Sequence, residues 1–421
     1  MKPKSGRGWF GASACWLALM LVGGAAAAEG VLTGLPPESV LRERLLASPS
    51  VRAALALLPA EQAAAQVEKK SPVAWSISGG VGYRSFADDP NHAPTETELT
   101  LQRPWRLGNK EQVQQQWFDE RERWVQAQIR MVARTALRDW LDALSVWLRE
   151  EGAAQLWGEQ LSLSRKQAQA VGRRHELGDV SRAERDLAEA AQVQVEAQST
   201  QAQARAKAAR ARLTVLLPGW SDTDLMSLLH SEPPALVATV GMVASPEDAP
   251  ELQLVQAEAL AAAGAARFEG AQRRADPTVG MRIGTAKGPD EKFIGVVFSM
   301  PLDGSARDSS AEAATHRAAN VAARVEMERQ RIVADRAARA IEAANSVIVW
   351  HQLTDAATRF DAHARTTERA WQLGQAALTD VVVAQRLALE QRLAAQQARA
   401  EALFRHWLWV LDQQPGLAAP L

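Results

Sequence analysis

The chain has 421 residues, of which 47% are hydrophobic but only 5% aromatic, so alanine supplies much of the apolar content. The 48 Lys+Arg and 49 Asp+Glu residues give a formal net charge of −1, which argues against a nucleic-acid-binding protein, because such proteins usually carry a basic stripe. The single cysteine excludes both a disulfide scaffold and a cluster of thiolate metal ligands.

The N-terminus has the pattern of a secretory signal peptide. A basic start is followed by an apolar stretch at 16–22 and by small residues before Glu29. We expect residues 1–28 to be a signal peptide, which makes the mature protein an exported one. Cys15 lies inside that segment and is a weak candidate for lipid attachment, because the apolar stretch follows it instead of preceding it. No other stretch has the roughly 18 consecutive apolar residues of a membrane-spanning helix, so we expect membrane insertion only as part of a closed β-barrel.

The rest of the sequence contains an internal duplication. Leu177-Gly178 corresponds to Leu373-Gly374 at an offset of 196 residues, and Pro104 corresponds to Pro301 at nearly the same offset. We therefore predict two structural repeats with the same order of elements. The predicted divisions are a first repeat at 29–219, a linker or equatorial segment at 220–246, a second repeat at 247–414 and a C-terminal tail at 415–421.

Each repeat contains a predicted β-hairpin, at 73–104 and at 278–302. In both hairpins apolar residues alternate with polar residues or glycine, which is the period of a strand with one apolar face. Such strands suit a membrane barrel, with apolar side chains toward lipid, and they also suit hairpins that pack on the helices of a soluble protein. Under the first interpretation the lipid-facing residues are Trp75, Ile77, Val81, Ile294, Val296 and Phe298.

Long helices follow the hairpins, at 109–174 and 305–372, and 66 residues at 1.5 Å each span about 99 Å. Leu137, Leu141, Leu144 and Leu148 recur at coiled-coil-like spacing. The tips at 175–181 and 372–379 lead into helices about half as long, and similar short helices are predicted at 37–71 and 249–275. We therefore predict that one long helix lies beside two short ones stacked in line, twice, in a layer four helices wide.

Four strands cannot close a membrane barrel alone, since the smallest single-chain barrels have eight. Three chains would supply twelve strands around an open lumen. A homotrimer is therefore the simplest assembly by which this sequence could form a pore.

The duplicated layout resembles the TolC family of outer-membrane efflux channels over essentially the whole mature chain. The local marks are the two Leu-Gly tips and the strand exit at 102–110, which reads QRPWRLGNK. That exit is similar to the corresponding stretch of heavy-metal efflux members, although Asn109 replaces a glycine and Arg103 intervenes. The order of these features and their double occurrence carry the resemblance more than any single motif.

The resemblance implies a mainly α fold with β: a periplasmic α-barrel of long helical hairpins and a trimeric 12-stranded outer-membrane β-barrel. It also implies a homotrimer in the cell outer membrane, with a long periplasmic extension, that exports small solutes or metal cations in a tripartite system. The implied partners are a periplasmic adaptor (membrane fusion) protein, an inner-membrane resistance-nodulation-division or other pump, and outer-membrane lipid, but no nucleic acid.

Family members close the tunnel near the tips, and the resemblance assigns that role to Asp380, six residues after Gly374. The family's second acidic position is Val383 here. Glu184 matches the acidic partner that helps keep the tip closed, but its usual basic partner is replaced by Ala376. The resemblance also assigns adaptor contact to the tip residues Leu177, Gly178, Val180, Ser181, Leu373, Gly374 and Ala376.

Other chemistry is sparse in the sequence. His175-Glu176 begins like a zinc-protease motif but lies at a predicted turn, and the remaining histidines lack ligand spacing. We therefore expect no enzyme activity, no metal site and no cofactor. A type I protein-secretion duct and a non-channel periplasmic helical adaptor or scaffold remain as alternatives, and the sequence does not identify the substrate, the pump or the adaptor.

Overall fold

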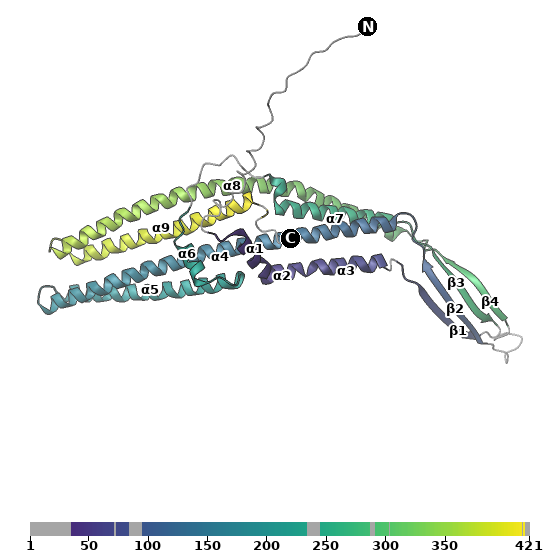
Figure 1. The fold of residues 1–421 in the computed structure, drawn as a ribbon, viewed down its shortest axis with the longest axis horizontal. Coiled ribbons are helices and arrows are strands. Elements are labelled where there is room, and N and C mark those ends of the chain that lie inside the picture. The colour runs from purple at the N-terminus through teal and green to yellow at the C-terminus, as the bar shows by residue number, and fades with distance from the viewer. Residues whose placement is uncertain are drawn as a thin grey trace, which may run out of the picture.

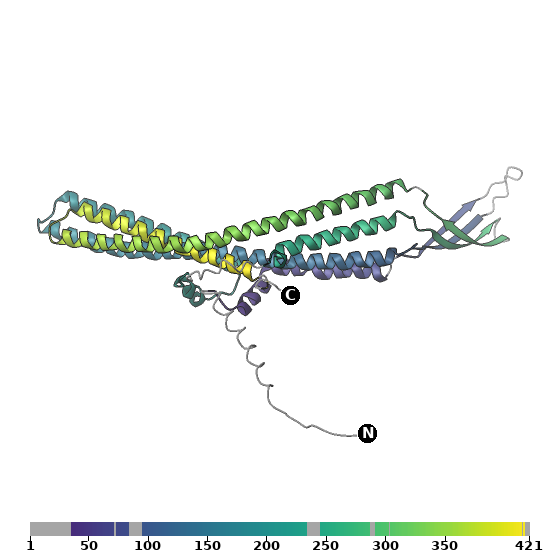
Figure 2. The ribbon, with the colours of Figure 1, turned by 90° about the horizontal axis from the view of Figure 1, so that it is seen from above.

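The computed structural model describes residues 35–70, 73–83, 95–233, 245–286, 291–302, 304–414 and 416. The predicted signal peptide with Cys15 and most of the tail at 415–421 lie outside these ranges. The described chain is long and narrow, with a β-sheet at one end and two helical hairpin tips at the other (Figures 1 and 2). In chain order its elements are α1 (Glu38–Ala47), α2 (Pro49–Leu55), α3 (Leu57–Lys70), β1 (Ser76–Tyr83), β2 (Thr95–Pro104), α4 (Lys110–Glu176), α5 (Arg182–Leu216), α6 (Asp222–Leu229), the 3₁₀ turn η1 (Pro246–Asp248), α7 (Pro250–Gln272), β3 (Thr278–Ala286), β4 (Glu291–Ser299), α8 (Ser305–Gln372) and α9 (Leu378–Gln413).

Two long helices organise the layer. α4 has 67 residues and α8 has 68, so each is about 100 Å long at 1.5 Å per residue. Toward the tips the order across the layer is α5, α4, α9, α8, and toward the sheet it is α3, α4, α7, α8 (Figure 1). One long helix therefore lies beside two short ones in line, twice, as predicted. None of the helices in the described ranges is long and apolar enough to cross a membrane.

The predicted helix at 37–71 is broken into α1, α2 and α3. Pro49 is the first residue of α2, where its missing N–H costs no helical hydrogen bond, and Ser48 Oγ caps that helix by accepting from Val51 N at 3.3 Å. Pro59 lies in the first turn of α3, so no helix runs through it from α2. A single helix over this range was therefore wrong, because the two prolines start new helices.

The main apolar core lies at mid-height, where α4 meets the ends of α5 and α9. Trp140, Trp147 and Trp407 are at most 1% exposed there. The chain after α5 packs against this core, since the rings of Trp140 and Trp220 stack with centroids 4.9 Å apart. The predicted linker thus forms a side structure on the layer over 220–233.

The sheet is antiparallel, in the order β1-β2-β3-β4. β2 of the first repeat pairs with β3 of the second, with Leu101 opposite Met281. Where the strands join the helices, Lys110 Nζ lies 2.6 Å from Asp276 Oδ1 and is only 2% exposed. This ion pair ties the start of α4 to the start of β3. The predicted fold class, long helical hairpins with four strands per chain, is confirmed.

Candidate functional site

One face of the sheet is apolar across all four strands. Ile77, Leu101, Met281 and Val296 are successive Cα partners and form a continuous row. The adjacent row contains Leu99, Ile283 and Ile294. The six residues predicted to face lipid all share this face, because they have the same strand parity.

These apolar side chains are also exposed, most strongly on the outer strands β1 and β4. Val296 is 81% exposed and Ile77 is 68% exposed, whereas Val297 and Phe293 on the opposite face are half-buried. A sheet packed on a soluble core has the reverse pattern, with its apolar side chains buried. The apolar face therefore lacks a covering layer within the described chain.

Aromatic residues mark both ends of this face. Trp75 immediately precedes β1 and Tyr83 ends it. The distance between these two residues along the strand is about 26 Å, at ~3.3 Å per residue. The guanidinium carbon of Arg103 lies 5.5 Å from the ring centroid of Trp75. An apolar band ~25 Å tall between aromatic girdles is the pattern of an outer-membrane barrel.

The other face is polar and rich in glycine. Ser78 pairs with Thr100, which pairs with Arg282, which pairs with Gly295. The Arg282 guanidinium lies 3.5 Å from Glu98 Oε2, and both side chains are about half exposed. This face suits contact with water.

The two tips have the same backbone geometry. At the first, Gly178 N donates to His175 O at 2.9 Å and Asp179 N donates to Arg174 O at 2.8 Å. The second repeats these distances, with donors Gly374 N and Gln375 N. Both glycines have positive φ, 83° and 73°, which explains why each helix ends at a Leu-Gly pair.

The tips differ in what they expose. Leu177 and Leu373 are 77% and 69% exposed, and Ser181 is exposed as well. Val180 and Ala376 instead pack against a cluster that includes Val171, Trp371, Leu378 and Val381, drawn from both hairpins. Of the predicted contact residues, the two leucines therefore present the largest apolar surface at the tips.

Both acids predicted for the gate act as helix caps. Glu184 Oε2 accepts from Ser181 N at 3.1 Å, while Ser181 Oγ accepts from Glu184 N, which completes the predicted capping box. Asp380 Oδ2 accepts from Ala377 N at 3.2 Å, but Ala377 has no side-chain oxygen to return the bond. Asp380 is exposed, so its carboxylate faces solvent while it caps α9.

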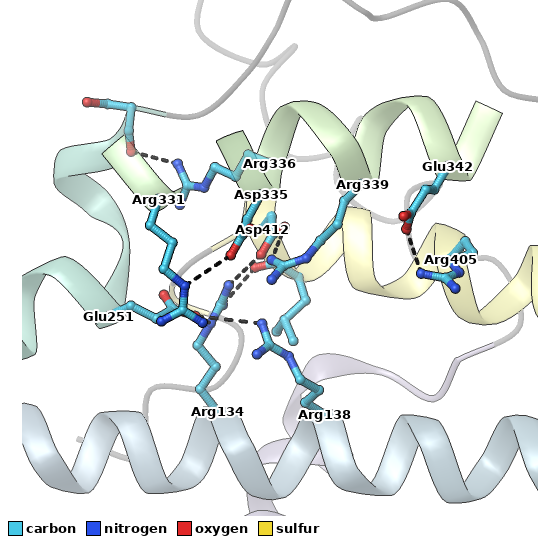
Figure 3. A network of polar contacts seen from close by, with 12 residues as sticks. Arg134, Arg138, Glu251, Arg331, Asp335, Arg336, Arg339, Glu342, Arg405 and Asp412 are labelled. Atoms are coloured by element: carbon cyan, nitrogen blue, oxygen red, sulfur yellow. Dashed lines mark hydrogen bonds and ion pairs between the residues drawn. The ribbon is translucent and has the colours of Figure 1, made fainter. Parts of the chain in front are cut away.

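A buried ionic network at mid-height was not predicted (Figure 3). Arg134 is 1% exposed; its guanidinium lies 2.9 Å from Glu251 Oε1 and 2.7 Å from Asp412 Oδ1 and donates to Leu411 O. Arg339 of α8 lies 2.6 Å from the other oxygen of Asp412. The network thus joins α4, α7, α8 and α9 at the point where α9 ends and α7 begins.

The arginines in this network perturb one another. Burial lowers the pKa of Arg138, and the charges of Arg339 and Arg134 lower it further. The pKa of Arg339 is raised, because its hydrogen bond and attraction to Asp412 outweigh the effect of burial. Burial alone would raise the pKa of Glu251, but attraction and hydrogen bonding by Arg134 lower it overall. The Glu251 carboxylate is therefore held in its charged form.

No group of three or more His, Cys, Asp or Glu side chains in the described ranges is placed to hold a metal ion. His175 Nδ1 lies 3.0 Å from Val180 O, within the first tip. The histidine singled out in the sequence thus makes a local contact at the turn.

No protein-family model and no curated protein matches the sequence. Its fold is, however, similar to solved structures over nearly their whole length. A membrane protein from Pseudomonas aeruginosa aligns with a TM-score of 0.74 at 12% identity, covering 97% of this chain and 96% of that one. The outer-membrane channel OprN aligns with a TM-score of 0.73 at 16% identity, covering 90% of each chain. The outer membrane protein VceC from Vibrio cholerae aligns with a TM-score of 0.69 at 18% identity, covering 90% of this chain and 96% of that one.

This chain has the fold of the TolC family of outer-membrane channels. The fold that the two Leu-Gly tips and the strand exit predicted by resemblance is therefore confirmed. The ionic network and the contact between the two tips were not predicted, and both join residues from different repeats.

Proposed function

We propose that this protein is an outer-membrane efflux channel in which three chains form one pore. The observation that carries the proposal is the apolar face of the sheet, whose side chains are exposed, up to 81% at Val296, and lie between Trp75 and Tyr83. Lipid is the environment that such a face requires, because exposed apolar surface of this extent is unfavourable in water.

Open edges on both sides of the layer support assembly with further copies. Within the described residues β1 and β4 end the sheet, and each leaves one row of backbone donors and acceptors for a neighbouring strand. On the edge helix α8, Met327, Ile341 and Ile348 are more than half exposed at multiples of seven residues. Such a stripe suits side-by-side helix packing. Three copies would join twelve strands and close the barrel.

The helices supply the periplasmic part of the proposed channel. The tips lie about 100 Å from the sheet along α4 and α8. We propose that they contact a periplasmic adaptor, which links the channel to an inner-membrane pump of the resistance-nodulation-division or another class. A crosslinker at Leu177 or Leu373 should capture the adaptor better than one at the half-buried Val180 or Ala376.

The transported substrate is proposed to be a small solute or a metal cation, with export of a protein as the alternative. The exposed carboxylate of Asp380 would recur three times around the axis near the tips. Like charges in one ring would attract cations to the entrance.

Fractionation and electrophysiology test the proposal together. We expect a heat-modifiable trimer in the outer membrane, and we expect the purified protein to conduct in planar bilayers. A soluble monomer that never conducts would favour the scaffold alternative.

A paired substitution tests whether the apolar face of the sheet contacts lipid. Ile77→Arg with Val296→Arg places two charges on the apolar face, at a cost that reaches ~2–4 kcal/mol per site at mid-membrane and is smaller toward the girdles, and should abolish the trimer. The matched control, Ser76→Arg with Val297→Arg, changes the adjacent residues on the polar face and should still assemble. Retained assembly of the first variant, or equal loss in both, would contradict a lipid-facing row.

A further inference from the structure

Two large side chains on the polar face of the sheet lean over glycines. Glu98 and Phe293 are long or bulky, and each stands opposite a glycine in the register: Glu98 opposite Gly80, and Phe293 opposite Gly284. If the polar face lines the proposed pore, the direction of these side chains decides how much of the lumen they occupy.

At the first position, Glu98 occupies the space that a side chain at residue 80 would take. A Cβ built on Gly80 would lie 3.1 Å from Glu98 Cγ and 3.3 Å from its Oε1. The other carboxylate oxygen lies 3.5 Å from the guanidinium of Arg282, on the adjacent strand β3. Glu98 is therefore held along the surface of the sheet, between Gly80 and Arg282.

The second position repeats the arrangement. A Cβ on Gly284 would lie 2.6 Å from Phe293 Cζ, so the ring covers that glycine. The Arg282 guanidinium carbon lies 5.3 Å from the centroid of the same ring. Arg282 thus contacts both side chains, and all three follow the sheet surface as one connected group.

We propose that Gly80 sets the free width of the pore by letting the Glu98 side chain lie against the wall of the lumen. This inference rests on the proposed channel function, and it adds to that proposal the class of solute that can pass. Glu98 and Phe293 fold back over glycines and Arg282 lies against both. Such a wall suits passage of solutes that keep their hydration shell, because a filter for bare ions needs groups that project and replace that shell.

Gly80 is the better of the two glycines to test. A Cβ there meets only the flexible Glu98 side chain within 3.4 Å, whereas a Cβ on Gly284 would also lie 2.4 Å from the backbone oxygen of Thr97. Gly80→Val should lift Glu98 away from the wall, and valine is well tolerated in strands. Gly82→Val is the matched control on the same face, since no described atom lies within 4 Å of its Cβ position.

The experiment measures single-channel conductance and the largest polyethylene glycol that enters the pore, on purified trimers in planar bilayers. Gly80→Val should lower both quantities more than Gly82→Val does. Adding Glu98→Ala should restore most of the loss in the Gly80→Val background and should change little in the Gly82→Val background. Gly80→Ala, a smaller change, should shift both quantities in the same direction.

The outcomes separate the two proposals. A wild-type protein that forms no channel would overturn the proposed function. A conducting wild type with equal effects of Gly80→Val and Gly82→Val, or with no rescue by Glu98→Ala, would overturn the role of Gly80 and leave the channel intact.

Discussion

The guanidinium carbon of Arg174 lies 5.4 Å from the ring centroid of Trp371, so the last turns of the two long helices touch at the tips. Arg174 belongs to the first repeat and Trp371 to the second. Trp371 is 8% exposed within the cluster formed by both hairpins. This contact joins the hairpins near Ala376, at the position where the resemblance to the TolC family predicts a basic residue.

Removing this cation–π contact should weaken the junction of the tips. We expect Arg174→Ala to lower the free energy of unfolding by about 0.5–1 kcal/mol, the usual size of a solvent-accessible pair. The adjacent exposed Arg173→Ala is the control. Thermal unfolding followed by the helical signal checks the prediction, and equal melting of the two variants would show that the contact contributes nothing.

The mid-height network should matter far more to stability. Arg134→Met leaves Asp412, which is 3% exposed, with one of its two arginines, and it deprives Glu251 of its nearest cation. Breaking a buried pair in this way costs about 3–5 kcal/mol. Denaturant unfolding should show this loss.

Arg386→Met provides the comparison, because it removes only an exposed i,i+4 pair with Glu390. Exposed helix pairs of this kind contribute about 0.3–0.5 kcal/mol. Similar losses for the two methionine variants would mean that the network at the α7–α9 junction adds no more than a surface pair.

The network also predicts a pH dependence. The pKa of Glu251 is lowered in the folded state from its ordinary value of 4.5. A lowered carboxyl pKa stabilises the fold above 4.5, and this contribution is lost as the pH falls from there through the folded pKa. The stability difference between wild type and Glu251→Gln should therefore be constant at neutral pH and shrink below 4.5. A difference that grows on acidification would contradict the sign of the shift.

The acid at the second tip has two separable roles. Asp380 accepts a hydrogen bond from Ala377 N and is also proposed to attract cations. Asp380→Asn keeps a cap oxygen but removes the charge, so it should reduce cation selectivity and trivalent-ion block in planar bilayers without changing the melting temperature. Asp380→Ala should reduce both selectivity and stability, the latter by about 1 kcal/mol, the usual size of a capping interaction.

Glu184→Ala should affect ion selectivity less, because the expected basic partner at position 376 is absent. If Asp380→Asn has unchanged selectivity and unchanged block, the carboxylate is a helix cap alone.

Much of the fold could be predicted because its signals are local or repeated. The period-two pattern identified both hairpins, and the two Leu-Gly pairs correspond to tips with the same hydrogen bonds. The breaks before α2 and α3 were missed because Pro49 and Pro59 were read as part of one helical segment. Both prolines are visible in the sequence, so more weight on them could have revealed the breaks.

The ionic network could not be predicted in the same way. Arg134 and Asp412 are 278 residues apart, and neither stands out among the chain's 48 basic and 49 acidic residues. Only the meeting of α9 and α7 beside the long helices brings them together. The contact of Arg174 with Trp371 could not be predicted for the same reason, since contacts between repeats depend on how the helices pack in the layer and not on local sequence pattern.

Labelling of single cysteines along β1 tests the central claim most directly. The only cysteine of the chain, Cys15, lies in the predicted signal peptide, so single-cysteine variants at 75–78 and 81–82 need no further substitutions. In reconstituted protein, we expect lipid-soluble quenchers to reach probes at Trp75, Ile77 and Val81, and water-soluble thiol reagents to reach Ser76, Ser78 and Gly82. Alternation along the strand would support a sheet with one face in lipid, whereas uniform access by water-soluble reagents at all six positions would contradict it.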